Sequence, residues 1–439
     1  MAKGDIIVGL DIGTTKICAI VGRKNDHGKL DILGLGKKAS DGVARGIVTN
    51  ISKTVETIIS TIEEASEKSN IEIGGVYVGI AGQHITSLQH RAVIVRNVGE
   101  EEISEKDIRR LINDVHKMAM QPGQQIIHVI PQEYTVDGEP GIREPIGMAG
   151  VKLEGNFHVV TGQATQVSNI QKCVNKAHLE VCDILLEPTA SSASVLSEEE
   201  KEAGVALVDM GGGTTDVAIF QNGVLRHTAV IPLGGNIITE DIRGGCNVMK
   251  RQAEQMKVQY GCALADEVNG QDIISIKSVG GREAKEISIK NLAHIIQARV
   301  EEIFEHVLFE IKASGYEHRL IGGIVLTGGG AELRHIAQLV EYVTTIETRI
   351  GEPIEHLSKG MVEEVRSPMY ATGVGLLMQG LEMEEQSEEV RRFHSARETS
   401  VASEEKTSGR KSGPGFLGNF FESMKGFFND DVSDFNENH

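Results

Sequence analysis

Two short segments of this sequence follow one pattern, and their repetition constrains the fold more than any other feature. GLDIGTTKICAIVG occupies residues 9–22 and VDMGGGTTDVAIF occupies residues 208–220. Each consists of an apolar run, an aspartate, a turn of glycine and threonine, and a second apolar run, which predicts two strands joined by a tight turn. Asp11 and Asp209 lie 198 residues apart, so we predict two similar lobes with a cleft between them. Two unrelated hairpins are the alternative.

The length, charge and cysteine content narrow the class of protein. A chain of 439 residues is long enough for two or more lobes. Its net charge of −19, without a basic stripe, disfavours nucleic acid as a partner. Five scattered cysteines without CxxC spacing favour a reducing cytoplasm over a disulfide framework or a zinc site. The N-terminus lacks the apolar core of a signal peptide, and no apolar run reaches the ~20 residues that span a bilayer.

Strand-like and helix-like segments alternate up to about residue 382, which predicts α/β lobes. Ser104 is a candidate helix N-cap. The predicted strands or buried apolar runs cover residues 6–10, 17–21, 76–80, 92–98, 125–136, 157–162, 181–186, 205–209, 216–220 and 323–326. Apolar residues at helical spacing predict helices over residues 51–68, 105–120, 167–178, 250–260 and 292–313.

Both turns have the chemistry of a phosphate-binding site. Glycine lets backbone amides approach an anion, and threonine hydroxyls add hydrogen-bond donors. An aspartate at a strand end can hold a hydrated Mg²⁺, and Lys16 can neutralise phosphate charge. A third glycine cluster, in IVLTGGGAEL at residues 324–333, follows a strand and opens a helix, which favours close approach of a nucleotide. The sequence contains no GxxxxGK[ST] motif, so the predicted site is not a P-loop.

The order of these motifs resembles that of the superfamily of actin, the heat-shock chaperone ATPases and the sugar kinases. Two phosphate motifs, two connecting segments and an adenosine motif are matched in turn by residues 11–15, 209–216, 185–196, 371–380 and 324–333. The first motif, the insert after VGIAGQH and the phenylalanine-rich C-terminus are similar to the FtsA family of bacterial cell-division proteins. The resemblance implies an actin-like two-lobed ATPase fold with duplicated ribonuclease-H-like subdomains, a disordered linker and a C-terminal amphipathic helix.

The resemblance also assigns roles to residues, with ATP and Mg²⁺ as cofactors. Asp11 and Asp209 would hold Mg²⁺ largely through water, and Glu187 would position the hydrolytic water unless it is a structural carboxylate before Pro188. Glu254 and Lys257 would contact the ribose and base; the alternative is a solvated surface pair. Further nucleotide contacts would come from Gly13, Thr14, Thr15, Lys16, Gly211, Gly212, Gly213, Thr214, Thr215, Gly328, Gly329 and Gly330.

The same resemblance divides the chain into subdomains. Residues 236–306 would form subdomain IIB, which in the family binds the C-terminal tail of FtsZ. Residues 87–164 would form subdomain IC, which serves filament contacts and later division proteins. The remaining divisions would be 1–86 with 165–198 as subdomain IA, 199–235 with 307–382 as subdomain IIA, 383–413 as the disordered linker, and 414–430 as the amphipathic helix.

The C-terminal tail has the pattern of a helix that lies on a membrane surface. Six of the eleven phenylalanines follow residue 410, after a charged, serine-rich stretch that predicts disorder. The segment is too short to span a bilayer, so we expect it to lie in the interface plane, where many tails on one polymer would bind through avidity. Docking on a partner or on the protein's own body is the alternative. One helix face would carry Phe416, Leu417, Phe420, Phe421, Met424, Phe427 and Phe428.

Taken with the resemblance, these features imply an ATP-binding filament protein with at most slow ATP hydrolysis. It would anchor the FtsZ ring to the cytoplasmic face of the cell membrane at the division site and recruit later division proteins. A small-molecule kinase of the same superfamily is an alternative, but it needs a base beside an acceptor hydroxyl, and no such motif stands out. An MreB-like cell-shape filament protein is another. A chaperone ATPase is disfavoured because the chain after Gly380 is too short for a substrate-binding domain.

Overall fold

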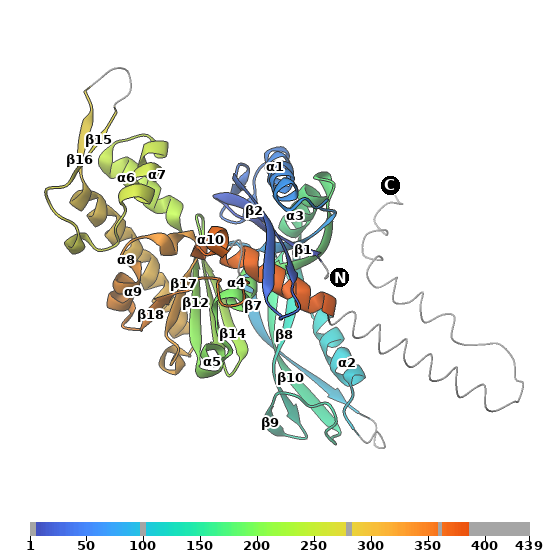
Figure 1. Ribbon diagram of the computed structural model, residues 1–439. Coiled ribbons are helices and arrows are strands. Elements are labelled where there is room, and N and C mark those ends of the chain that lie inside the picture. Colours follow the sequence, from blue (N-terminus) through green and yellow to red (C-terminus); the bar gives the residue numbers. More distant parts are fainter. Residues whose placement is uncertain (1–5, 97–101, 278–282, 359–361, 386–439) are drawn as a thin grey trace, which may run out of the picture. The chain divides into compact units, whose positions relative to one another are not determined.

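Two five-stranded sheets with the same topology form the framework of the structure (Figure 1). The computed structural model describes residues 6–96, 102–277, 283–358 and 362–385. The first sheet has the order β11-β6-β1-β2-β3 and the second has the order β14-β13-β12-β17-β18. Their strands are β1 (Ile6–Ile12), β2 (Lys16–Lys24), β3 (Leu30–Ala39), β6 (Gly75–Ile80) and β11 (Glu180–Leu186), and β12 (Val205–Met210), β13 (Thr215–Gln221), β14 (Val224–Ile231), β17 (Ile324–Thr327) and β18 (Thr348–Ile350).

Strand directions are the same in the two sheets. β1 pairs antiparallel with β2, and β12 pairs antiparallel with β13. The third strand of each sheet, β3 or β14, is again antiparallel to its neighbour. The remaining strands pair in parallel: β6 with β1 and β11, and β17 with β12 and β18. The repetition predicted from Asp11 and Asp209 is therefore a repetition of whole sheets, and the predicted α/β class is confirmed.

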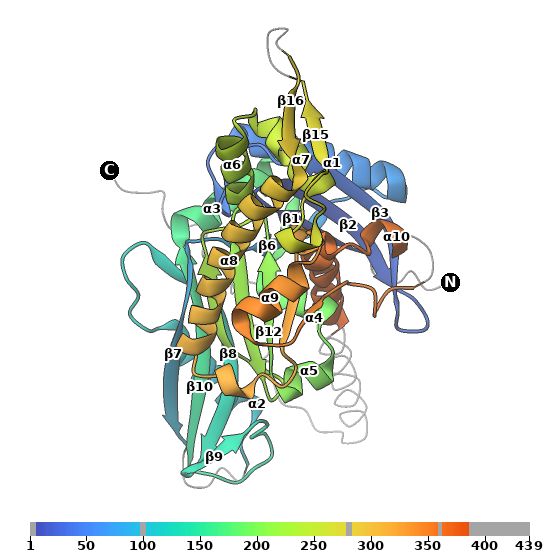
Figure 2. The same cartoon turned by 90° about the vertical axis from the view of Figure 1, so that its left-hand side faces the viewer.

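Helices cover both faces of each sheet, because both faces are apolar. Ile58 and Ile170 bring α1 and α3 onto the first sheet, and residues 374–381 of a helix over 371–385 cover its other face. Figure 2 shows α8 lying along the second sheet, where its buried residues join the core. The helices are α1 (Ile51–Ser69), α3 (Ala164–Lys176), α4 (Glu187–Val195), α5 (Glu198–Ala203), α6 (Gly235–Cys246), α7 (Lys250–Tyr260), α8 (Ile289–Ala313), α9 (Ile336–Thr344) and α10 (Val362–Val365).

An insert with its own sheet and core follows β6. Its strand order is β7-β10-β8-β9, and α2 packs on this sheet through Leu111 and Val115. The lobes also contain two small hairpins, β4–β5 and β15–β16. The bounds are β7 (Ile85–Val95), α2 (Glu105–His116), β8 (Gln124–Val136), β9 (Glu139–Ile142), β10 (Lys152–Gln163), β4 (Val43–Ala44), β5 (Ile47–Val48), β15 (Ile273–Ile276) and β16 (Lys285–Ser288), with 3₁₀ turns η1 (Ala265–Glu267), η3 (Glu317–Arg319), η4 (Gly329–Glu332) and η5 (Pro368–Tyr370).

Most predicted elements are found within a few residues of their predicted ends. α1 begins after Asn50, whose side chain accepts a hydrogen bond from the backbone of Lys53, as a helix N-cap should. Ser104 is the N-cap of α2, but α2 ends at His116 and not at the predicted residue 120. Met118 leaves the helix and packs against the core of the insert. β7 starts at Ile85, seven residues before the predicted strand, and residues 97 and 98 of that prediction lie outside the described residues.

The described residues reach only the start of the predicted C-terminal segments. Residues 383–385, which begin the predicted linker, continue the helix over 371–385. The rest of the linker and the amphipathic helix, 386–430, lie outside the described residues. Within the part of the chain that is described, no helix has both the length and the apolar character needed to cross a bilayer.

Candidate nucleotide-binding site

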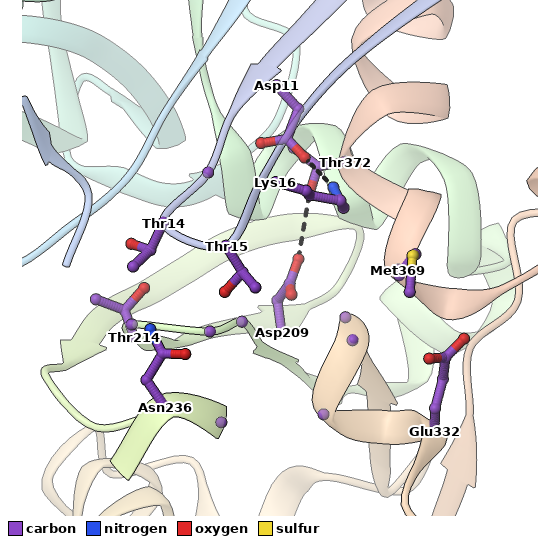
Figure 3. Close-up of a pocket in the computed structure, with 18 of the residues that line it drawn as sticks. Asp11, Thr14, Thr15, Lys16, Asp209, Thr214, Asn236, Glu332, Met369 and Thr372 are labelled. Carbon is purple, nitrogen blue, oxygen red and sulfur yellow. Dashed lines mark hydrogen bonds and ion pairs between the residues drawn. The ribbon is translucent and has the colours of Figure 1, made fainter. Parts of the chain in front are cut away.

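A cavity of about 460 Å³ lies between the two repeated hairpins (Figure 3). The β1–β2 turn lines one side and the β12–β13 turn lines the other. The glycine turn after β17 and the helix α7 complete the wall. The structure thus brings together residues predicted from five separate segments of the chain: Asp11, Gly13, Thr14, Thr15, Lys16, Glu187, Asp209, Gly211, Gly212, Gly213, Thr214, Glu254, Lys257, Gly328, Gly329 and Gly330.

Glycine is required where the two turns meet. A Cβ on Gly212 would collide with Oγ1 of Thr15, and a Cβ on Gly213 would lie 2.6 Å from Oγ1 of Thr14. Figure 3 shows Thr14 and Thr15 directed from one turn toward the other. Small residues therefore let the two hairpins approach each other, and they let an anion come close to the backbone of both turns.

The glycine turn after β17 packs against β12 in a similarly close way. Gly328 has φ +83°, in the left-handed region that glycine adopts without strain. A Cβ on Gly328 would collide with Oδ1 of Asp209, and a Cβ on Gly330 would collide with the side chain of Met210. This turn is the predicted adenosine motif, and its backbone borders the cavity because no side chain intervenes.

Asp11 and Asp209 both face the cavity, but they have different partners (Figure 3). Nζ of Lys16 forms an ion pair with Oδ2 of Asp11 at 2.5 Å. Burial alone lowers the pKa of Lys16, but the charges of Asp11 and Asp209 outweigh it, so the pKa lies above its ordinary value. Oδ2 of Asp209 accepts hydrogen bonds from Ser191 at 2.8 Å and from Thr372 at 3.3 Å. Burial raises the pKa of Asp209, which has hydroxyl donors but no bonded cation among the described residues.

Two more buried carboxyl groups lie at the cavity. Burial, followed by the charge of Asp209, raises the pKa of Asp216 to about 7. Thr214 donates to Oδ2 of Asp216 at 3.1 Å, whereas Oδ1 has no hydrogen-bond partner among the described residues. Burial and the neighbouring charges of Asp11, Asp216 and Asp209 raise the pKa of Glu187. A cation placed among these groups would stabilise their ionised forms.

The carboxyl groups of the described residues do not form a closed metal cage. Among the described residues, no group of three or more histidine, cysteine, aspartate or glutamate side chains lies close enough to hold a metal ion. Mg²⁺ keeps several waters and binds through one or two carboxylates together with phosphate oxygens. A hydrated Mg²⁺ that arrives with a polyphosphate would need only one or two of these carboxylates.

Glu254 and Lys257 form a pair on the α7 side of the cavity. Nζ of Lys257 contacts Oε2 of Glu254 at 2.8 Å, the carbonyl of Gly235 at 2.9 Å and Oγ1 of Thr239 at 2.9 Å. The Lys257 side chain is 12% exposed and that of Glu254 is 39% exposed, so the pair is only partly solvated. Both residues line the cavity.

Thr215 is the predicted contact that the structure does not bring to the cavity. It is fully buried in β13, and its hydroxyl donates to the carbonyl of Leu233 at 2.9 Å. Successive side chains of a strand point to opposite faces, so Thr214 and Thr215 cannot both face the cavity. The sequence reasoning did not assign Ser191, Asp216 or Thr372 to the site, although each lies inside a quoted motif.

Family models match both lobes and the insert. The model described as "Cell division protein FtsA" matches residues 206–375. The model described as "SHS2 domain inserted in FTSA" matches residues 82–161, which overlaps the β7–β10 insert. A third model, described as "Hsp70 protein", matches residues 163–236 and so includes the second phosphate motif.

Individual relatives extend the similarity over most of the chain. Cell division protein FtsA of Pseudomonas aeruginosa is 43% identical over 380 residues, which cover 87% of this chain and 90% of the relative. The FtsA protein of Escherichia coli strain K12 is 36% identical over 384 residues, with 86% and 90% covered. That of Bacillus subtilis strain 168 is 36% identical over 377 residues, with 86% and 84% covered.

Solved structures share the fold at low sequence identity. A chain of the PilM–PilN type IV pilus biogenesis complex has a TM-score of 0.63 at 15% identity, and 85% of this chain and 98% of that chain are covered. MreB5 of Spiroplasma citri bound to ADP has a TM-score of 0.52 at 14% identity, with 87% and 98% covered. The predicted actin-like fold is confirmed by these similarities.

Proposed function

The chain belongs to the FtsA family of cell-division proteins, and on this premise we propose that it is an ATP-binding adaptor that polymerises and anchors the FtsZ ring to the cytoplasmic face of the cell membrane. The observation that carries the proposal is the cavity in which two equivalent hairpins face each other across Thr15 and Gly212. The nucleotide-bound state of the structural neighbour MreB5 supports the choice of ligand.

The residues of the cavity fit a triphosphate with Mg²⁺. The amides and hydroxyls of the two turns would hold phosphate oxygens, and the glycine turn after β17 would border the adenosine. Asp11 and Asp209 would hold Mg²⁺ largely through water, and the ion would neutralise phosphate charge. Two observations support this: Oδ1 of Asp216 has no hydrogen-bond partner among the described residues, and the pKa of Glu187 is raised. A nearby cation would stabilise the ionised form of both carboxyl groups.

Glu187 is the candidate for positioning a water molecule at the terminal phosphate. It is the first residue of α4, and its side chain lines the cavity next to the two hairpins. Burial and the charges of Asp11, Asp216 and Asp209 raise the pKa of Glu187, so the neighbouring groups act on this carboxyl directly. We assign at most slow ATP hydrolysis to the site, which suits a filament protein better than a metabolic enzyme.

Direct measurement of ATP binding tests this function. We expect Asp209→Ala to lower ATP affinity in magnesium by about 10- to 100-fold, the range that metal-site changes produce. Asp26→Ala removes a carboxylate from an exposed turn of the first lobe and serves as the matched control. Affinity should be measured with a fluorescent ATP analogue, with magnesium and with chelator. Equal affinity of Asp209→Ala and Asp26→Ala in magnesium would contradict the proposed site.

Membrane anchoring is assigned to the tail helix 414–430, which lies outside the described residues. Its support is the apolar face predicted from the sequence, since burying each large apolar side chain is worth roughly 1.5–3 kcal/mol. Phe420→Glu with Phe427→Glu should abolish co-sedimentation with lipid vesicles. The control is Asn419→Glu with Ser423→Glu, which adds the same charge to the polar face. If both double variants sediment like the unaltered protein, the tail is not the anchor.

The partner assignments follow the proposed subdomains. Residues 236–306 contain α6, α7, the β15–β16 hairpin and most of α8, and we assign the FtsZ C-terminal tail to this region. The insert is assigned to filament contacts and to later division proteins. Crosslinking of an FtsZ tail peptide, followed by mass spectrometry, should label residues 236–306; labelling confined to the insert would overturn this assignment.

A further inference from the structure

One segment of the first lobe touches both phosphate turns and the root of the insert. Residues 40–50 leave the end of β3, form the β4–β5 hairpin and reach the N-cap of α1; we call this segment the strap. Its start is fixed by a hydrogen bond from the Ser40 amide to the carbonyl of Thr15, at 3.0 Å. Its end is fixed by Thr49 and Asn50, whose amides donate to the carbonyl of Gly42.

The tip of the strap orients Thr14, a residue predicted to contact phosphate. The amide of Gly46 donates to Oγ1 of Thr14 at 3.2 Å, and Gly46 itself lines the cavity. A hydroxyl that accepts this bond still has its own proton to donate. The strap therefore orients the Thr14 hydroxyl so that it can donate toward the cavity. A phosphate that accepts a hydrogen bond from this hydroxyl would displace Gly46 through the bond that joins Gly46 to Thr14.

The same tip touches the hairpin of the second lobe. A Cβ built on Gly213 would lie 3.0 Å from both the nitrogen and the Cα of Arg45. Arg45 has φ +51°, a left-handed backbone conformation that costs energy for a residue other than glycine. A shift of the β12–β13 turn toward or away from the first lobe would therefore change its contact with Arg45, the strained residue.

The opposite side of the tip rests on the chain segment that enters the insert. A Cβ on Gly46 would lie 2.5 Å from the carbonyl oxygen of Ala81 and 2.6 Å from Cα of Gly82. A Cβ on Gly82 would lie 2.9 Å from the carbonyl oxygen of Arg45. The amide of Ile85, the first residue of β7, donates to the carbonyl of Gly82 at 3.0 Å. Backbone meets backbone without a side chain between them, so a displacement of the tip is passed on to β7.

We propose that the Arg45–Gly46 turn couples nucleotide in the cleft to the position of the insert, residues 85–163. Nucleotide that engages Thr14 and Gly213 shifts the turn, and Ala81, Gly82 and β7 move with it. By linkage, a partner that binds the insert changes ATP affinity by the factor with which ATP changes affinity for that partner. The coupling rests on the proposed function, because it requires ATP in this cavity.

A second contact between the insert and a lobe provides the competing route. Ser87 in β7 donates to the carbonyl of Thr228 in β14 at 3.1 Å, and Gln89 donates to the carbonyl of Arg226 at 3.1 Å. These bonds join the insert to the second lobe without passing through the strap. A test of the proposal must therefore separate the strap from this contact.

Hydrogen exchange of residues 85–95, measured with and without ATP and magnesium in the full chain, tests the coupling. In the unaltered protein we expect ATP to change exchange in β7 by about fivefold or more, the lower end of typical coupling factors. Arg45→Gly accepts the left-handed backbone of the turn without strain, so the protein folds. Because a glycine turn deforms at little cost, we expect it to absorb the displacement, so that β7 no longer responds to ATP. Gly82→Ala, which adds a methyl group against Arg45, is the second variant and should also change the response.

Two controls complete the experiment. His178→Gly relaxes another exposed left-handed residue, at φ +63°, away from the strap, and should respond to ATP as the unaltered protein does. Ser87→Ala removes one of the hydrogen bonds between the insert and β14 and should also keep the response.

The outcomes separate this proposal from the proposed function. If ATP binds but exchange in β7 is unchanged, or if Ser87→Ala loses the response and Arg45→Gly keeps it, the coupling proposal is wrong and the nucleotide site stands. If the unaltered protein does not bind ATP, the proposed function fails first and the coupling fails with it.

Discussion

The β1–β2 and β12–β13 hairpins have the same backbone but different charges. The amide of Gly13 donates to the carbonyl of Lys16 at 3.0 Å, and the amide of Gly211 donates to the carbonyl of Thr214 at 2.9 Å, at equivalent positions of the repeat. Asp11 pairs with Cys18 across the first hairpin, and Asp209 pairs with Asp216 across the second. The duplicated backbone explains why two distant segments provide the same kind of anion cradle.

The side chains at these equivalent positions give the two hairpins different charges. The first hairpin has Lys16 where the second has Thr214, and Cys18 where the second has Asp216. Burial raises the pKa of the Cys18 thiol to about 12, so Cys18 is neutral. The first hairpin is thus balanced by its own lysine, while the second has surplus carboxyl groups that a bound cation would stabilise.

Removal of Lys16 should produce the largest effect. Lys16→Met leaves Asp11 without its ion-pair partner in a buried site, and a broken buried pair typically costs about 3–5 kcal/mol. Chemical denaturation at neutral pH should show a loss of this size. A change below about 1 kcal/mol, as expected for an exposed pair, would show that the first hairpin does not depend on its own cation.

A methyl group at the point where the hairpins meet should have the next largest effect. Gly212→Ala displaces the hydroxyl of Thr15, a predicted donor to phosphate, and the lost charge-assisted bond should weaken ATP binding by about 10- to 100-fold. Gly74→Ala is the matched control, because its Cβ would meet no atom within 4 Å and Gly74 is not part of the cavity wall. Titration of both variants with ATP and magnesium should separate them; equal affinities would mean that the hairpins do not act together.

Aspartate-to-asparagine changes should have opposite signs in the two hairpins. The pKa of Asp216 is about 7 when folded against 3.8 ordinarily, so its stabilising contribution is complete below about pH 3.8 and is lost as pH rises to 7. Asp216→Asn should therefore stabilise the nucleotide-free protein by about 1 kcal/mol or more at about pH 8, and by less in acid. Asp11→Asn should destabilise it, because Lys16 loses its partner.

Thermal unfolding between about pH 5 and pH 8 measures both changes. Two variants that shift the unfolding temperature in the same direction at the upper pH would contradict the assigned division of charge.

Removal of Lys257, the lysine on the second-lobe side of the cavity, should have the smallest effect on stability. Lys257→Met breaks a pair whose carboxylate, Glu254, is 39% exposed, so we expect a loss of less than about 1 kcal/mol. If the pair contacts ribose or base, ATP affinity falls while stability changes little. Unfolding and ATP titration on the same preparation decide between this role and a surface pair; a loss of stability as large as that of Lys16→Met would mean that the two lobes use their lysines alike.

Local patterns were sufficient to predict much of the fold. Helix α1 ends within one residue of the predicted segment 51–68, because its apolar spacing and the cap at Asn50 are written in adjacent residues. Helix α7 coincides with the predicted segment 250–260. Helix α6 and the helix over 371–385 were not predicted as helices, since their sequences contain several glycines that lower helix propensity.

The candidate site was predictable in its backbone and less so in its side chains. Glycine-rich turns indicate that a ligand can approach the backbone closely, so Gly13, Gly212 and Gly328 could be assigned to the site from the sequence. Thr215 was assigned with Thr214 because the sequence does not show which face of β13 meets the cavity. The bonds from Ser191 and Thr372 to Asp209 join segments 18 and 163 residues away along the chain, and no local pattern reports such contacts.

The sequence by itself determined that two hairpins of one kind exist, because strand and turn preferences depend on neighbouring residues. Only the tertiary structure decided that Thr15 faces Gly212 and that Lys16 pairs with Asp11. It also decided that Asp216 is buried and that its Oδ1 has no hydrogen-bond partner among the described residues. These features depend on how closely the two lobes approach and how much water they exclude. Burial and distance set the charge of a carboxyl group, and both are properties of the folded chain.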